Sequence, residues 1–92
     1  MIKSWRHKGL KLFYETGSTA KIQAKHAGKL HDILQALDFA AAPEQMSFPS
    51  FGLHKLRGNL ENFYSVKVNG NWRVVFCFEG RDVILVDYLD YH

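Results

Sequence analysis

The chain has 92 residues, of which 47% are hydrophobic, and it carries a formal net charge of +3. This length supports one domain with a small core, so residues 1–92 are interpreted as a single domain and any active site as an open surface rather than a deep cleft. The excess of positive charge is mild, and it fits either general solubility or a polyanionic partner.

The sequence gives no sign of a membrane or an oxidising compartment. No apolar run is long enough to span a bilayer, and the first residues lack the apolar core of a signal peptide. The one cysteine, Cys77, stands in an apolar stretch and is interpreted as a core residue. A cytoplasmic protein with no membrane partner is therefore expected.

The first third of the chain predicts a short strand and a helix. Residues 1–5 fit a brief first strand. Residues 7–15 predict a helix, because Leu10 and Phe13 recur at helical spacing and Gly17 follows as a stop signal.

A second helix is predicted from Ala20 to about Phe39, with Ser18 and Thr19 as its N-cap residues. Its apolar residues fall on one stripe that would pack on a sheet. The residues that fall mostly off the stripe include three lysines: Lys21, Lys25 and Lys29. A partner that carries acidic or phosphate groups could meet this basic side of the helix.

From Phe51 onward the hydrophobic residues alternate, as they do in β-strands. Before that point, residues 40–49 predict a connector with a brief helical turn after Pro43. Strands are predicted for residues 51–57, 63–68, 72–78 and 83–90, with turns at Asn69-Gly70 and Glu79-Gly80. The order predicts an α+β fold, with two N-terminal helices packed on a mainly antiparallel sheet of four to five strands.

Arg73 is the first candidate functional residue, because it lies in a strand that is apolar on both faces. A guanidinium in such a strand needs a partner, since burying an unpaired charge is costly. One interpretation is an ion pair with a carboxylate such as Asp87 or Asp90. The other is a phosphate clamp, because the planar guanidinium matches phosphate oxygens in bidentate fashion.

The C-terminal residues Asp90, Tyr91 and His92 are the second candidate, since they follow the last strand directly. Histidine can transfer a proton near neutral pH, and tyrosine can donate a hydrogen bond or stack on a base. His54 is the third, although its neighbours Leu53 and Leu56 also fit a half-buried structural histidine. On these residues alone, a structural interpretation stands beside the catalytic one.

Metal binding is the competing chemistry, because the chain has five histidines. No pair of them has the tight spacing of metal-ligand motifs. His26 is interpreted as a polar-face or boundary residue of the second helix. Neither a metal site nor another cofactor is expected.

Four segments together resemble the HigB toxins of the RelE/ParE superfamily of toxin–antitoxin systems. They are residues 2–10 (IKSWRHKGL), 53–58 (LHKLRG), 71–76 (NWRVVF) and 90–92 (DYH). The resemblance covers the whole chain and keeps the order of the segments. It implies a RelE-like fold and a ribosome-dependent endoribonuclease that cleaves mRNA in the ribosomal A site without a metal.

The resemblance also implies partners. They are the ribosome with its mRNA and a HigA-like antitoxin with a helix-turn-helix domain, so that operator DNA is met only through the toxin–antitoxin complex. The alternative on the same fold is a ParE-like toxin that inhibits DNA gyrase and cleaves nothing.

The resemblance assigns roles to residues of this chain. It implies a catalytic set in which Arg73 stabilises phosphate: His54, Arg73, Asp90, Tyr91 and His92. It places Lys55 and Arg57 where basic loop residues hold the RNA backbone. The family often has proline at the position of Lys55, so this loop departs from the pattern.

Overall fold

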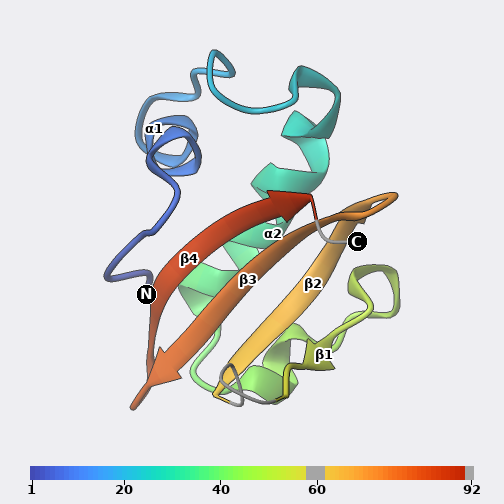
Figure 1. Cartoon of the computed structure of the whole chain (residues 1–92). Helices are drawn as coiled ribbons and strands as arrows, with labels where there is room; N and C mark the ends of the chain where they lie inside the picture. Colours follow the sequence, from blue (N-terminus) through green and yellow to red (C-terminus); the bar gives the residue numbers. More distant parts are fainter. Residues whose placement is uncertain (58–61, 91–92) are drawn as a thin grey trace.

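The computed structural model describes residues 1–57 and 62–90 and has two α-helices and a four-stranded antiparallel sheet (Figure 1). The sheet order is β1-β2-β3-β4, and α2 lies across one face of it. The helices are α1 (Lys8–Thr16) and α2 (Ala27–Phe39), and the strands are β1 (His54–Lys55), β2 (Phe63–Asn69), β3 (Trp72–Glu79) and β4 (Asp82–Asp90). The predicted α+β fold is therefore confirmed.

The predicted first strand is wrong, because residues 1–5 form only two isolated parallel bridges beside β4, Ile2 with Val83 and Trp5 with Val86. A bulge in β4 interrupts the ladder between these bridges: Leu85 has a φ of 57°, and its N–H donates to Ser4 Oγ at 2.9 Å. The N-terminal residues therefore cover the edge of β4 without adding a fifth strand.

The first helix matches its prediction. It begins after His7, whose Nδ1 accepts the N–H of Leu10 at 2.9 Å, and it ends at Gly17 with a φ of 80°. Gly9 lies at a close crossing of two segments, where an added Cβ would be 2.8 Å from the carbonyl oxygen of Lys21.

The predicted start of the second helix is wrong, while its end at Phe39 is confirmed. Residues Ala24–His26 form a 3-10 turn, and α2 begins at Ala27. Ser18 caps only a turn, since its Oγ accepts the N–H of Ala20 at 3.3 Å. Tertiary contacts hold the preceding chain out of the helix, because it must cross α1 and place the Gln23 N–H against the Tyr88 hydroxyl.

The three lysines predicted to share a helix side are consequently dispersed. Lys21 and Lys25 precede α2. Lys29 lies within α2, but its Nζ donates to the Ser50 carbonyl at 2.7 Å and lies over the Phe51 ring. No continuous basic helix side results.

The connector contains the predicted turn after Pro43, as the 3-10 helix Pro43–Met46. A second 3-10 helix, Pro49–Phe51, replaces the first part of the strand predicted for residues 51–57. Gly52, with a φ of 56°, then redirects the chain, so β1 is limited to His54 and Lys55.

Both predicted hairpins are present, with the first turn shifted by one residue. Asn69 pairs with Trp72 in the ladder, which leaves Gly70 and Asn71 as the two turn residues. Gly70 has a φ of 56°, as the first residue of a type II′ turn requires. The second turn follows the same plan, with Gly80 at a φ of 62° between paired Glu79 and Asp82.

The two faces of the sheet differ in what they contact. We call the face packed on α2 the helix face; it buries Val66, Val74, Phe76, Val86 and Tyr88 against Leu30, Ile33 and Leu37. We call the other the open face; by alternation along the strands it carries His54, Phe63, Ser65, Lys67, Arg73, Val75, Cys77, Asp87 and Leu89. Cys77 is buried, as predicted. In the part of the chain that is described, no helix is long and apolar enough to cross a membrane.

Candidate functional site

The strand register places His54 and Arg73 on the open face. His54 pairs with Ser65, and Ser65 pairs with Val75, so these residues form one row across the sheet. Arg73 lies one row away, and its Nη1 donates to Ser65 Oγ at 3.4 Å. Ser65 is only 1% exposed, which makes it a buried polar link between the two candidate residues.

Arg73 has no carboxylate partner among the described residues. Neither Asp87 nor Asp90 lies within ion-pair distance of its guanidinium, and Asp87 Oδ1 instead accepts the N–H of Tyr88 at 2.9 Å. Within residues 1–57 and 62–90, this half-buried guanidinium makes one long side-chain hydrogen bond, to a neutral hydroxyl, which leaves most of its five donors for another acceptor. The geometry thus favours the phosphate-clamp interpretation of Arg73 over the ion-pair interpretation.

Two further cations lie on this face, and the sequence interpretation missed both. Lys67 is exposed and stands directly opposite Arg73 in the β2–β3 ladder, an arrangement of like charges that does not stabilise the sheet. Arg6 reaches the face from the N-terminal segment, with its guanidinium carbon 5.2 Å from the centre of the Phe63 ring. The hairpin register could have revealed Lys67, whereas the position of Arg6 depends on tertiary packing.

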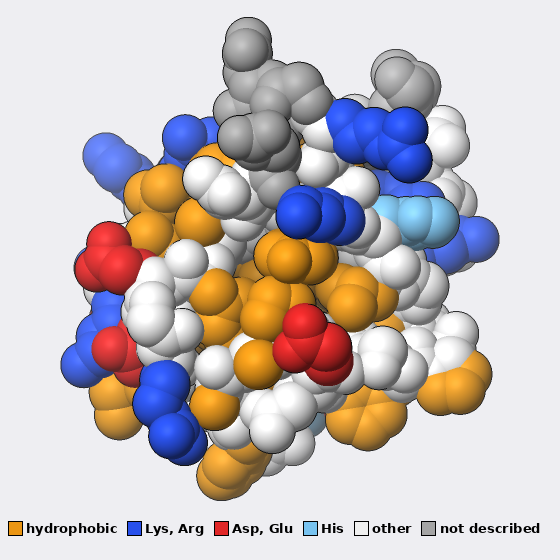
Figure 2. All heavy atoms as spheres, turned by 90° about the horizontal axis from the view of Figure 1, so that it is seen from below, with side chains coloured by type: hydrophobic (Ala, Val, Ile, Leu, Met, Phe, Trp, Pro, Cys, Tyr) orange, Lys and Arg blue, Asp and Glu red, His pale blue; other side chains and the backbone are white. Residues whose placement is uncertain are grey.

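Lys55 and Arg57 are both exposed, at the β1 edge of the sheet. Lys55 pairs with Tyr64, so the register places Lys55 on the helix face of the sheet, whereas His54 lies on the open face. Figure 2 shows Lys, Arg and His side chains gathered in the upper right of that view, and hydrophobic side chains over its centre and lower rim. Solvated cations beside the open face are suited to contact a polyanion.

Asp90 ends β4, at the opposite edge of the sheet from β1. Three strand spacings separate those edges, which is roughly 14 Å. Asp90 pairs with Trp72, and Arg73 pairs with Leu89. Asp90 and Arg73 therefore lie at neighbouring positions of the β3–β4 ladder, on opposite faces of the sheet. Tyr91 and His92 lie outside the described residues. The structure therefore brings His54 and Arg73 together on one face and leaves Asp90 at the end of the far strand.

His26 is not the boundary residue that the sequence predicted. It is 2% exposed, and its Nδ1 lies 2.6 Å from the Tyr88 hydroxyl. Burial lowers the pKa of His26, and the nearby charge of Lys25 lowers it further. The prediction failed because it assumed a helix that began before His26, whereas His26 is the residue that precedes α2.

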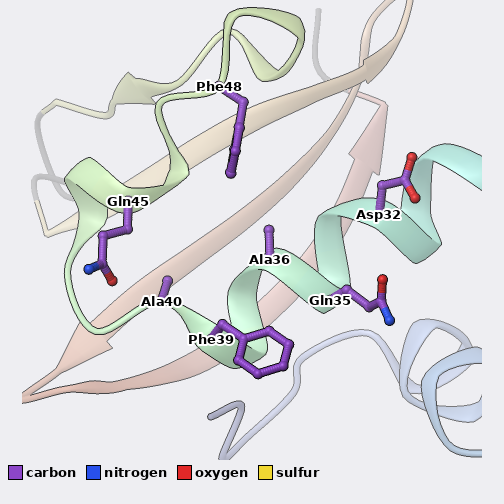
Figure 3. Close-up of a pocket in the computed structure, with 7 residues that line it drawn as sticks. All are labelled: Asp32, Gln35, Ala36, Phe39, Ala40, Gln45 and Phe48. Atoms are coloured by element: carbon purple, nitrogen blue, oxygen red, sulfur yellow. The ribbon is translucent and has the colours of Figure 1, made fainter.

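Two hollows bordered by α2 lie away from the open face. One of about 450 Å³ lies between α2 and the connector, on the helix side and away from the open face (Figure 3). Ala36, Ala40 and Phe48 contribute apolar groups to it. Among the described residues, no three His, Cys, Asp or Glu side chains come together as metal ligands would.

The fold is shared with solved YoeB structures. The YoeB dimer from Staphylococcus aureus is similar with a TM-score of 0.62 and 19% identity, over 99% of this chain and 97% of that one. The YoeB–YefM complex from the same organism contains a chain with a TM-score of 0.64 and 19% identity, over 100% of this chain and 98% of that one. At this identity the likeness shows the fold.

Sequence similarity identifies the family. Residues 3–92 match the family model of the RelE-like toxin of type II toxin-antitoxin system HigB. Endoribonuclease HigB of Proteus vulgaris is 40% identical over 92 residues, which is the full length of both chains. The chain belongs to the HigB-like toxin family, as its sequence motifs predicted.

Proposed function

We propose that this chain is the toxin of a type II toxin–antitoxin system and an endoribonuclease that cleaves mRNA in the ribosomal A site. Family membership and the endoribonuclease name of the Proteus vulgaris relative support the reaction. The observation that carries the proposal here is Arg73, a half-buried cation without a carboxylate partner among the described residues, on the same sheet face as His54.

The residue types suit RNA cleavage without a resident cofactor. The 2′-hydroxyl attacks the adjacent phosphate, so one group must accept its proton and another must protonate the leaving oxygen. In this proposal His54 or His92 serves as general acid or base, and Asp90 orients the reacting groups. Arg73 stabilises the charge that accumulates on phosphorus, and Tyr91 stacks on or hydrogen-bonds to the nucleotide.

The basic residues around the open face hold the RNA backbone. Lys55 and Arg57 do so from the β1 edge, and Lys67 adds a contact beside Arg73. Such contacts weaken as salt increases, because phosphate binding releases counterions. His54 and Lys67 are exposed on the open face, so both are accessible to an RNA that the ribosome presents.

The proposed partners follow from the family. A HigA-like antitoxin with a helix-turn-helix domain neutralises the toxin, and operator DNA is bound only through that complex. The YoeB–YefM complex is one example of a protein of this fold with its partner. Action on ribosomes places the toxin in the cytoplasm.

The test maps new 5′ ends of mRNA in a translating extract that receives wild-type protein or the variants Arg73→Ala, Asp90→Ala and His92→Ala. We expect cuts within codons at the A site for the wild type and strong loss of cleavage in each variant. Full-rate cleavage by all three variants would refute the residue assignment. Absence of cuts by the wild type, combined with inhibited DNA supercoiling by gyrase, would establish the ParE-like alternative instead.

A further inference from the structure

Four aromatic side chains from four different segments of the chain meet near the end of β4. His26 and Trp72 lie with ring centres 5.7 Å apart, and Trp72 and Tyr88 lie 4.6 Å apart at an interplanar angle of 32°. His7 contacts the other side of Tyr88 at 5.3 Å. His7 and Trp72 belong to the family-typical motifs, yet the proposed reaction gives neither of them a role.

Two hydrogen-bond contacts converge on the Tyr88 hydroxyl. The Gln23 N–H donates to its oxygen at 3.4 Å, and His26 Nδ1 lies 2.6 Å from the same oxygen. The tautomer of His26 sets which of the two side chains donates in the second contact. His26 Nε2 is buried and has no partner in the described part of the chain, which is a cost the fold retains.

The cluster joins the start of α2 to the end of β4. On its outer edge β4 receives the N-terminal segment only as far as Val86, where Arg6 N–H and His7 N–H donate to the Val86 carbonyl. Beyond Val86, β4 pairs with β3 as far as Asp90, and the Tyr88 hydroxyl lies against His26. Asp90 lies two residues after Tyr88, and its ladder partner is Trp72, the ring that packs on Tyr88.

We propose that His26 and Tyr88 are positioning residues, whose hydrogen bond fixes the end of β4 and so orients Asp90 for catalysis. This inference rests on the proposed function, because it assigns the bond a role in the same reaction. Neither side chain touches substrate: Tyr88 is 3% exposed and His26 is 2% exposed. A misplacement of about 1 Å at a reacting group can cost roughly a hundredfold in rate, so a small displacement of the strand end is sufficient to matter.

The decisive variant is Tyr88→Phe, which keeps the ring packing and removes only the hydroxyl. The matched control is Tyr64→Phe in β2, where a half-buried tyrosine stacks on Phe76 on the same helix face. Multiple-turnover cleavage on programmed ribosomes gives kcat and KM for both variants. We expect kcat of Tyr88→Phe to fall about tenfold with KM unchanged, and the control to cleave as the wild type does.

Changes at His26 separate positioning from general loss of stability. His26→Asn keeps an acceptor near the position of Nδ1, and it should restore kcat close to the wild-type value at neutral pH. His26→Leu should match Tyr88→Phe, and the double variant should be no slower than either single variant, because both remove the same bond. The acid limb of the kcat profile should also shift in His26→Asn; the other charged or titratable groups around the cluster, His7 and Lys25, are unchanged in that variant.

Wild-type kcat in Tyr88→Phe, or additive losses in the double variant, would overturn the inference. If the wild-type protein cuts no mRNA, the proposed function fails, and the positioning claim is then decided by the amide NMR signals of residues 88–90. Those signals must shift and broaden in Tyr88→Phe but not in Tyr64→Phe, and unchanged signals would overturn the claim.

Discussion

The open face and the helix face of the sheet are built from alternate residues of the same three long strands, yet they differ in chemistry. The helix face buries valines, Phe76 and Tyr88 against α2. The open face carries Arg73, Lys67 and His54, and among the described residues Arg73 donates to the Ser65 hydroxyl and has no carboxylate partner. The helix face thus accounts for much of the core, while the open face carries charges that no described carboxylate neutralises.

This difference separates two kinds of variant. Truncation on the helix face should unfold the protein and abolish activity with it. Removal of His54 or Lys67 from the open face should slow cleavage while the free energy of unfolding stays nearly constant, because both side chains are exposed and exposed groups contribute little to stability.

The largest expected effect on the helix side is that of Phe76→Ala. Phe76 is fully buried between the sheet and α2, so its truncation should lower the free energy of unfolding by about 3–5 kcal/mol. Urea denaturation followed by circular dichroism measures this change. Phe48→Ala serves as the matched control. Phe48 is 50% exposed, so its truncation should lower the free energy of unfolding far less. Equal decreases in the free energy of unfolding of the two variants would contradict the burial of Phe76 in the core.

On the open face, His54→Ala should slow mRNA cleavage about a hundredfold, as expected for loss of a general acid or base. Its free energy of unfolding should change by less than about 0.5 kcal/mol, since His54 is exposed. His31→Ala is the control, because His31 is also exposed but lies on α2. If both variants cleave at the wild-type rate, His54 has no catalytic role and belongs with structural histidines.

Gly9→Ala tests the crossing of α1 and the segment before α2. The added methyl group would lie 2.6 Å from Lys21 Cβ and 2.8 Å from the Lys21 carbonyl oxygen, so we expect a loss of about 1–3 kcal/mol. Gly28→Ala is the opposite case within α2, because no atom lies within 4 Å of the added group. It should stabilise the protein by roughly 0.5–1 kcal/mol. Thermal unfolding of Gly9→Ala and Gly28→Ala measures the two changes in stability.

The smallest effect concerns pH. Burial lowers the pKa of His26 below its ordinary value of 6.5, so the unfolded chain binds a proton more readily than the folded one. The stability that neutral His26 provides is therefore complete above pH 6.5 and is lost as the pH falls from there toward the lowered native pKa. Urea midpoints at pH 7.5 and 5.5 should differ more for the wild type than for His26→Asn. An identical pH dependence of the two proteins would exclude His26 as the titrating group.

Local patterns were sufficient to predict most of the fold. Alternating hydrophobic residues indicated β2, β3 and β4, and Gly70 and Gly80 marked the hairpins. The errors arose where distant contacts determine the backbone. The segment before α2 is held out of the helix by its crossing over Gly9, and β1 is shortened by the turn at Gly52.

The site was predictable to a different degree at each residue. Arg73 could be identified because a charge interrupts a strand that is apolar on both faces. The burial of His26 could not, because its environment comes from Tyr88 and Trp72, more than 40 residues away in the sequence. The roles of Tyr91 and His92 stay predictions, since both lie outside the described residues.

The central claim, that Arg73 on the open face takes part in the chemistry, is tested most directly by single-turnover mRNA cleavage with Arg73→Ala and Arg81→Ala. Both variants remove one arginine, but Arg81 is exposed in the β3–β4 turn, away from the open-face cluster. We predict that Arg73→Ala cleaves about a hundredfold more slowly than the wild type, while Arg81→Ala cleaves at the wild-type rate. Equal rates in the two variants, with both proteins folded, would contradict the account.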